Sequence, residues 1–294
     1  MLIDSHNHSH YNGVGPEGLI AEMDNFGIDL AWLLTWYLPP SEHVPSSHRA
    51  FNPRNGRPDG THAGVTLADV LETCQRFPTR FVAGYCPCPT EGNAADLFEA
   101  AYRVYGVRVC GEWSYRTLLD DPRAIELFRR AGQLHCPVVL HIDAPYLPDA
   151  QGKPIYQEFW YGGHIGAFER ALQACPETIF IGHAPGFWRY MSGDEATECA
   201  IYPAGPIQPG GRLLEMFEQY PNLWADLSAG SGLGALRRDP VFGRDFLIRY
   251  ADRLLYGRDN KGNALQEFLK TIELPQAIQD KLFFQNAQKL VATG

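Results

Sequence analysis

Several features that define common protein classes are missing from this sequence. It contains no stretch of 18 apolar residues, so no membrane-spanning helix is predicted. Its first residues read as a strand and lack the basic segment and apolar stretch of a signal peptide. Acidic residues outnumber basic residues by 34 to 25, and the net charge of −9 argues against a dedicated nucleic-acid surface.

The cysteines lack the pattern of a disulfide framework. Seven of them, an odd number, are scattered at positions 74, 86, 88, 110, 136, 175 and 199. One residue separates Cys86 from Cys88, whereas zinc knuckles and redox pairs use a spacing of two residues. We therefore expect ordinary packing for this pair, and reduced thiols in a cytoplasmic protein with no membrane or nucleic-acid partner.

The length suits one large domain, and no linker or change of composition divides the chain. A protein of 294 residues can bury about 75% of its unfolded surface. Runs typical of strands alternate with runs typical of helices. The expected strands are residues 2–8, 28–37, 81–85, 107–110, 137–141, 178–183, 223–227 and 253–257. The expected helices are residues 16–26, 66–77, 94–105, 122–134, 165–174, 212–220, 239–250, 264–272 and 276–291.

Eight strands, each followed by a helix, predict an α/β fold with a parallel sheet closed into a (β/α)₈ TIM barrel over residues 1–294. An open, doubly wound sheet is the alternative, but it would not require the eighth unit. Two long segments rich in Gly and Pro, residues 38–65 and 187–210, interrupt the alternation. Loops of such length in compact domains are usually functional lids or disordered.

The first strand carries polar residues at alternate positions, Asp4, His6 and His8. Successive side chains of a strand point to opposite faces, so these three share one face, with the imidazoles roughly 6.5 Å apart along the strand. That spacing lets both histidines reach one metal ion, with Asp4 supporting the site. The pair alone is weak evidence, because ten histidines in 294 residues make accidental pairs common.

Other expected strands also end in histidines or carboxylates. Glu112 follows the fourth strand, His141 and Asp143 the fifth, His183 the sixth and Asp259 the eighth. The carboxyl ends of barrel strands meet at one rim, and chemistry takes place there. Imidazole and carboxylate groups are ligands of zinc and similar divalent ions. The sequence therefore predicts a metal-dependent enzyme with its site at this rim.

In their order along the chain, these motifs resemble the amidohydrolase superfamily: Asp4-x-His6-x-His8 on the first strand, His141 on the fifth, His183 on the sixth and Asp259 on the eighth. The ending Asn286-Ala287-Gln288-Lys289-Leu290 resembles the Asn-Ala-x-x-Leu ending of the amidohydrolase-2 (amidohydrolase-related) branch, so the resemblance spans residues 4–290. Two features depart from that branch. The eighth strand ends in Gly-Arg-Asp-Asn, where Gly-Ser/Thr-Asp-x-Pro is more usual, and Glu112 is instead similar to the fourth-strand glutamate of TatD-like hydrolases.

The resemblance implies a metal centre and a reaction that begins with water. The expected ligands are His6, His8, His141 and Asp259, and Asp259 would also take the proton from the attacking water. The ion, which we expect to be zinc, would lower the pKa of the water toward about 7. His183 could orient that water, act as an acid or base, or bind a second ion with Glu112 and His141. One or two ions per chain are expected.

A small organic molecule is the expected substrate. Aromatic side chains near strand ends, Trp188 among them, suit such a ligand. Arg54 and Arg189, in loops on the same face, could bind a substrate carboxylate. A homo-oligomer is compatible with the sequence.

Two reactions fit these features best. The first is hydrolysis of an ester, lactone or amide by a metal-activated water, and the alternative is non-oxidative decarboxylation of an aromatic or unsaturated acid. A bridging Glu112 favours the hydrolase, whereas a single ion in an arginine-lined pocket favours the decarboxylase. A TatD-like nuclease is less favoured because the sequence lacks a basic stripe. A non-catalytic binding protein is also less favoured, because every ligand position of the family is filled.

Overall fold

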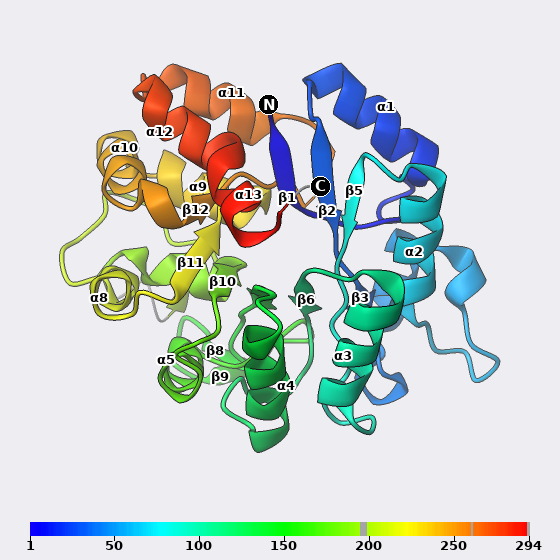
Figure 1. Cartoon of the computed structure of the whole chain (residues 1–294). Helices are drawn as coiled ribbons and strands as arrows, with labels where there is room; N and C mark the ends of the chain where they lie inside the picture. Colours follow the sequence, from blue (N-terminus) through cyan, green and yellow to red (C-terminus); the bar gives the residue numbers. More distant parts are fainter. Residues whose placement is uncertain (195–198, 260, 293–294) are drawn as a thin grey trace.

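Parallel strands around a central axis form the core of the molecule. The computed structural model describes residues 1–194, 199–259 and 261–292. The barrel strands among them are β1 (Ile3–Asn7), β2 (Leu30–Leu33), β5 (Phe81–Ala83), β6 (Cys110–Trp113), β7 (Val138–His141), β10 (Phe180–His183), β11 (Leu223–Asp226) and β12 (Leu254–Leu255). Figure 1 shows these strands at the centre with the helices outside them.

Two seams join the strands into a barrel. The ladders give one sheet in the order β1–β2–β5 and another in the order β12–β11–β10–β7–β6. Gly84 and Val109 form a parallel bridge beside β5 and β6. At the other seam, the Ser5 amide donates to the Tyr256 carbonyl over 2.9 Å, which links β1 to the end of β12. The predicted TIM barrel is confirmed.

Helices follow the strands and cover the outside of the barrel. They are α1 (Pro16–Phe26), α2 (Leu67–Arg76), α3 (Ala94–Tyr105), α4 (Pro122–Gln133), α5 (Ile165–Ala174), α8 (Arg212–Gln219), α9 (Ala229–Arg237), α10 (Pro240–Arg249) and α11 (Ala264–Thr271). Their boundaries follow from capping residues. The side chains of Thr66, Asp121 and Asp239 each accept a backbone N–H at the start of α2, α4 and α10. Gly27 ends α1 in the left-handed conformation.

Large apolar side chains fill the interior of the barrel, and the last helices close one end of it. The interior cluster contains Ile3, Trp32, Leu34, Val109, Val139, Ile181, Trp224 and Leu255. The chain ends with α12 (Gln276–Asp280), a π-helical turn (Lys281–Gln285) and α13 (Asn286–Leu290). Ala287 and Val291 from this segment join the interior cluster. Because Ile3 lies at the start of β1, the segment closes the amino-terminal end of the barrel, as Figure 1 shows.

A long excursion separates β2 from α2. The sequence predicts one strand through residue 37, but the barrel strand ends at Leu33, and β3 (Trp36–Tyr37) pairs antiparallel with β4 (Gly64–Val65). Between them lie three short helical turns, η1 (Pro40–Glu42), η2 (Pro45–Ala50) and η3 (Pro53–Asn55). We call residues 38–63 the lid segment. Gly64 is required at its end, because a Cβ there would lie 2.1 Å from the Trp36 carbonyl oxygen.

Other boundaries also differ from the sequence-based prediction. The fourth strand was expected at residues 107–110 but forms at β6, because its ladder with β7 begins only at Cys110. The segment 187–210 was expected to be a loop, but it begins inside α6 (Pro185–Trp188) and η4 (Arg189–Met191). Residues 195–198 of that segment lie outside the described residues. A hairpin of β8 (Tyr146–Pro148) and β9 (Pro154–Tyr156), which was not predicted, follows β7.

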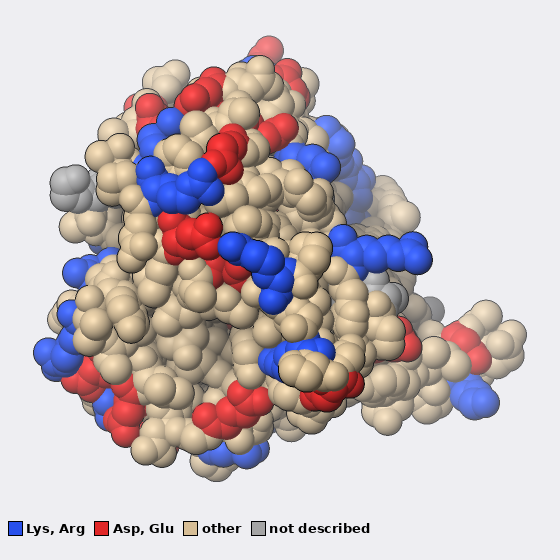
Figure 2. All heavy atoms as spheres, turned by 90° about the vertical axis from the view of Figure 1, so that its right-hand side faces the viewer, with Lys and Arg blue, Asp and Glu red and all other residues tan. Residues whose placement is uncertain are grey.

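Charged side chains of both signs share the surface. Figure 2 shows Lys and Arg interspersed with Asp and Glu on the face that carries α1 and α2, without a continuous basic stripe there. Arg80 pairs with Asp24 on this side of the molecule, at 2.8 Å. Within the described ranges, no helix is long and apolar enough to cross a membrane. All seven cysteines are free thiols.

Candidate metal centre and active site

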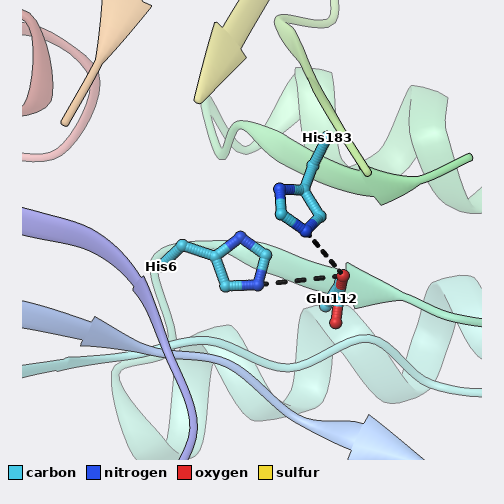
Figure 3. A group of neighbouring side chains, drawn as sticks. All are labelled: His6, Glu112 and His183. Atoms are coloured by element: carbon cyan, nitrogen blue, oxygen red, sulfur yellow. Dashed lines mark ion pairs between the residues drawn. The ribbon is translucent and has the colours of Figure 1, made fainter. Parts of the chain in front are cut away.

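Five side chains meet in one cluster at the carboxyl ends of the barrel strands: His6, His8, Glu112, His183 and Asp259. The Nε2 atoms of His6 and His8 lie 3.7 and 3.4 Å from the nearest Glu112 oxygens. The same nitrogens lie 3.7 and 3.4 Å from Oδ1 of Asp259. Nε2 of His183 is 4.0 Å from Glu112 and 3.4 Å from Asp259. Figure 3 shows the rings of His6 and His183 directed at the Glu112 carboxylate.

Asp4 fixes the turn that carries Asp259. Its carboxylate accepts hydrogen bonds of 2.8 Å from both the backbone amide and Nε of Arg258. The next residue, Asp259, has a left-handed backbone (φ 52°) and donates its amide to the His6 carbonyl over 2.8 Å. The pairing with Asp4 therefore explains why an arginine can occupy the position where the family more usually has Ser or Thr. Asp4 supports the site without joining the cluster.

The cluster residues fit a divalent ion. Ligand atoms of the cluster form two sets of three, and within each set all three atoms lie within 4.8 Å of one another. One set is His6, Glu112 and His183, and the other is His6, His8 and Asp259. Four atoms of the cluster are among the buried side-chain atoms that have no hydrogen-bond partner in the described part of the chain: Nε2 of His6, Nε2 of His8, Oε2 of Glu112 and Oδ1 of Asp259. Leaving such atoms unpaired costs free energy. Imidazole nitrogens and carboxylate oxygens are ligands of zinc and similar ions, so a bound ion would satisfy these atoms.

The electrostatics of the cluster agree with this fit. Burial lowers the pKa of His8, but the carboxylates of Asp259 and Glu112, each 3.4 Å from its Nε2 atom, outweigh burial and raise it to about 10. Burial raises the pKa values of Glu112 and Asp259, but the surrounding histidines, His6 first among them, bring both below their usual range. The carboxylates and the imidazoles of the cluster thus favour each other's charged forms. A divalent ion would take the place of the protons on the ligand nitrogens.

Asp226, which sequence reasoning missed, orients two of the histidines. It lies fully buried at the carboxyl end of β11, and its oxygens lie 2.8 Å from Nδ1 of His6 and 3.0 Å from Nδ1 of His183. A carboxylate can only accept, so both Nδ1 atoms donate and both Nε2 atoms face the cluster without a proton when an ion is bound. The Ser228 amide fixes the carboxylate over 2.9 Å. The sequence did contain a feature that indicates Asp226: it is a carboxylate at the end of the seventh strand, and the same kind of position identified Asp259 after the eighth.

His141 lies beside the cluster with both ring nitrogens facing carboxylates. Nδ1 is 3.0 Å from Oε1 of Glu112, and Nε2 is 3.0 Å from Oδ2 of Asp143. Burial lowers the pKa of His141, but these two carboxylates outweigh burial and raise it to about 9. Neither set of three ligand atoms found among the described residues includes His141. Its role as a metal ligand stays a prediction.

The predicted substrate-binding residues lie in different surroundings. Arg54 pairs with Glu72 of α2 at 2.9 Å, and its side chain is 62% exposed. Trp188 and Arg189 are buried just after β10. They line a small cavity of about 70 Å³ together with Tyr202 and other residues. Contact between substrate and these three residues stays a prediction.

A larger cavity of about 350 Å³ reaches the cluster at Asp259. Its wall is formed by the segments after β1, β11 and β12, and includes Tyr11, Ala229, Asp259 and Lys261. The Asp259 side chain is 17% exposed, whereas that of His6 is fully enclosed. Of the five cluster residues, Asp259 is the one that lines this cavity, whose volume suits a small organic molecule.

The motifs, the barrel and the site agree with a comparison against protein families. A family model described as amidohydrolase matches residues 3–292. The chain belongs to this family, in the amidohydrolase-2 branch that its motifs predicted. It is therefore a member of a family of metal-dependent enzymes that act on small molecules. A comparison with curated proteins found no match.

Solved structures share the barrel at low sequence identity. An uncharacterized TIM-barrel protein, Bb4693 from Bordetella bronchiseptica, is 16% identical with a TM-score of 0.62, over 99% of this chain and 98% of that one. A probable 2-pyrone-4,6-dicarboxylic acid hydrolase from Acinetobacter baumannii is 13% identical with a TM-score of 0.55, over 98% of both chains. A 5-carboxyvanillate decarboxylase from Novosphingobium aromaticivorans, complexed with manganese, is 16% identical with a TM-score of 0.56, over 92% and 78%. At these identities the similarity shows the fold alone.

Proposed function

We propose that the protein is a metal-dependent hydrolase of a small ester, lactone or amide. The observation that carries this proposal is the position of Glu112, which is 2% exposed and lies among the rings of His6, His8, His141 and His183. An acid at this position favours a hydrolase, whereas a decarboxylase would not need Glu112 as a ligand. His6, His8, Glu112, His183 and Asp259 would hold one or two ions between them, and zinc is the ion we expect.

Asp259 and His183 have separate roles in the proposed hydrolysis. A bound divalent ion polarises a substrate carbonyl and makes water acidic at neutral pH. Asp259 meets the cavity and is held as an anion, so it is the group that accepts a proton from the attacking water and returns it to the leaving group. His183 lies 3.4 Å from Oδ2 of Asp259 and is oriented by Asp226. As a ligand, it would help to hold the ion beside the Asp259 carboxylate.

Non-oxidative decarboxylation of an aromatic or unsaturated acid is the second candidate. One observation favours it: both sets of ligand atoms contain His6. An imidazole nitrogen binds one ion at a time, so the two sets cannot both be filled. A centre with a single ion is what we expect of a decarboxylase.

Metal content and product analysis distinguish the two reactions. Protein loaded with zinc or with manganese is assayed against panels of lactones, esters, amides, phosphodiesters and hydroxybenzoic acids. We expect release of acid from a lactone or ester, followed with a pH indicator, or release of amine from an amide, followed with an amine-reactive dye. Release of carbon dioxide from an aromatic acid, with no hydrolysis, would replace the proposal by the second candidate. Protein that retains no divalent ion after supplementation would contradict both.

A further inference from the structure

Asp69, in the first turn of α2, forms hydrogen bonds both at the start of its own helix and with the lid segment. Its carboxylate is 3% exposed, and Oδ2 accepts hydrogen bonds from the Thr66 amide (2.9 Å) and the Thr66 hydroxyl (2.7 Å). The bond from the Thr66 amide, together with that from the Asp69 amide to Oγ1 of Thr66 (3.3 Å), forms a capping box at the start of the helix. Two further bonds come from the lid segment, from Nδ2 of Asn55 (2.6 Å) and Nδ2 of Asn52 (3.0 Å). Capping does not require these bonds to residues 14 and 17 positions earlier in the chain.

The charge of Asp69 strengthens this contact. Burial raises the pKa of its carboxyl group, but the hydrogen bonds from Thr66, Asn52 and Asn55 outweigh burial and bring it below the usual range. Asp69 is therefore an anion at neutral pH, and hydrogen bonds to an ionised acceptor are stronger than neutral ones.

The two asparagines organise the rest of the lid segment. Oδ1 of Asn52 accepts the Arg54 amide over 3.2 Å, and the Asn52 carbonyl lies 3.0 Å from Nε2 of His62. Asn55 also donates to the Gly64 carbonyl over 3.0 Å. The carboxylate of Asp69 is thus the point from which residues 52–64 are arranged.

The residues just before Asn52 contact the segment after β1. The Ala50 carbonyl accepts the Asn12 amide over 2.7 Å. The ring of Phe51 lies 6.0 Å from the ring of Tyr11, measured between centroids. Moving residues 50 and 51 would therefore move Tyr11.

Tyr11 connects this arrangement to the metal centre. Its ring lies 5.7 Å from that of His8, and it stands on the wall of the 350 Å³ cavity that reaches Asp259. Trp36, 5.4 Å from both Tyr11 and Phe51, completes the aromatic contacts. A molecule in the cavity would meet Tyr11 and Asp259 together.

We propose that Asp69 is a positioning residue of the active site: through Asn52 and Phe51 it keeps Tyr11 on the cavity wall beside Asp259. Asp69 itself touches neither the cavity nor the cluster. The inference rests on the proposed function in one respect, because it takes the cavity at Asp259 as the place where substrate binds.

Three variants separate positioning from helix capping. Asp69→Asn weakens both sets of bonds. Asn52→Ala removes one of the two bonds from the lid segment to Asp69 and leaves the capping box in place. Thr66→Ala removes both bonds of the Thr66 hydroxyl at the start of the helix and leaves Asn52 and Asn55 on Asp69. We expect the first two to raise KM about fivefold, the effect of one lost hydrogen bond, with kcat within about twofold and metal content unchanged. Thr66→Ala should lower the melting temperature and leave KM unchanged.

Hydrogen exchange gives a readout that does not depend on turnover. We expect faster exchange of backbone amides in residues 8–14 and 48–64 of Asn52→Ala and Asp69→Asn, but not of Thr66→Ala. Wild-type exchange in residues 8–14 of Asn52→Ala, or an equal rise in KM for Thr66→Ala, would overturn the proposal and leave Asp69 as a helix cap. Faster exchange in a protein that turns over no substrate would support the positioning role and count against the proposed function.

Discussion

Asp226 accepts hydrogen bonds from His6 and His183 at once, and it therefore orients both rings in the cluster. In Asp226→Asn the side-chain amide keeps the volume but presents its NH₂ group to one of the Nδ1 donors. We expect metal affinity to fall about 10- to 100-fold, with a parallel loss of activity, as for other residues that orient metal-bound histidines. Competition with a coloured chelator measures the affinity.

The matched control for this variant is Asp252→Asn, because the Asp252 carboxylate is 73% exposed and pairs with Lys281 on the surface. It should bind metal as the wild type does. Wild-type affinity in Asp226→Asn, in protein shown by circular dichroism to be folded, would remove Asp226 from the metal centre.

Strand periodicity predicted which residues share the rim, but not how each ring is turned. His6, His8, Glu112, His183 and Asp259 were all selected from their positions at strand ends, and the structure brings them together. The ring of His141 faces Asp143 as well as Glu112, and this choice depends on a side-chain rotamer that spacing does not encode. Asp226 followed the same strand-end pattern, and its function becomes visible only when His6 and His183 are placed beside it.

Glu169 braces two neighbouring helices of the outer layer. From α5 it accepts hydrogen bonds from Nη2 of Arg212 at the start of α8 (2.6 Å to Oε2) and from the Tyr220 hydroxyl at its end (2.9 Å). Burial raises the pKa of Glu169, but Arg212 and Tyr220 outweigh burial and bring it below the usual range. A lowered pKa in the folded state means that the charge stabilises the fold above the unfolded pKa of about 4.3, and that this contribution is lost as the pH falls.

We therefore expect Glu169→Gln to lower the free energy of unfolding at pH 7, with a difference from wild type that shrinks below about pH 4. Urea denaturation at several pH values measures it. Glu215→Gln is the control, because Glu215 pairs with the same arginine but its side chain is 54% exposed. A difference that is constant with pH would show that Glu169 acts through packing alone.

Elements with strong periodicity were predictable, and elements set by long-range contacts were not. The amphipathic helices α3, α4 and α5 lie where apolar spacing placed them. α9 was missed because its nine residues, Ala229–Arg237, include three glycines, which lower helix propensity. One of them, Gly232, is required by packing, since a Cβ there would lie 2.5 Å from the Leu227 carbonyl oxygen. The conformation of the lid segment likewise depends on Asp69. No local sequence pattern indicates that Asp69 binds Asn52 and Asn55.

At the level of the whole molecule, the cluster joins segments from both ends of the chain. Its possible ligand atoms come from β1 and the residue after it, from β6, from β10 and from the turn after β12, so an ion bound there would hold residues 6 and 259 together. An ion that binds only the folded state stabilises it by about 2.7 kcal/mol at 100 times its dissociation constant. For a protein of 294 residues that corresponds to a rise in melting temperature of about 4 °C.

We expect a chelator such as dipicolinate to lower the melting temperature by about this amount, and zinc or manganese to restore it. Thermal unfolding followed by intrinsic fluorescence measures the shift, and elemental analysis confirms that the ion has been removed. The control is Glu112→Gln, in which a ligand oxygen is lost and the effect of the chelator should be smaller. Equal melting temperatures for metal-free and metal-loaded wild-type protein would mean that the cluster satisfies its buried polar atoms without an ion, and the metal centre would then have to be abandoned.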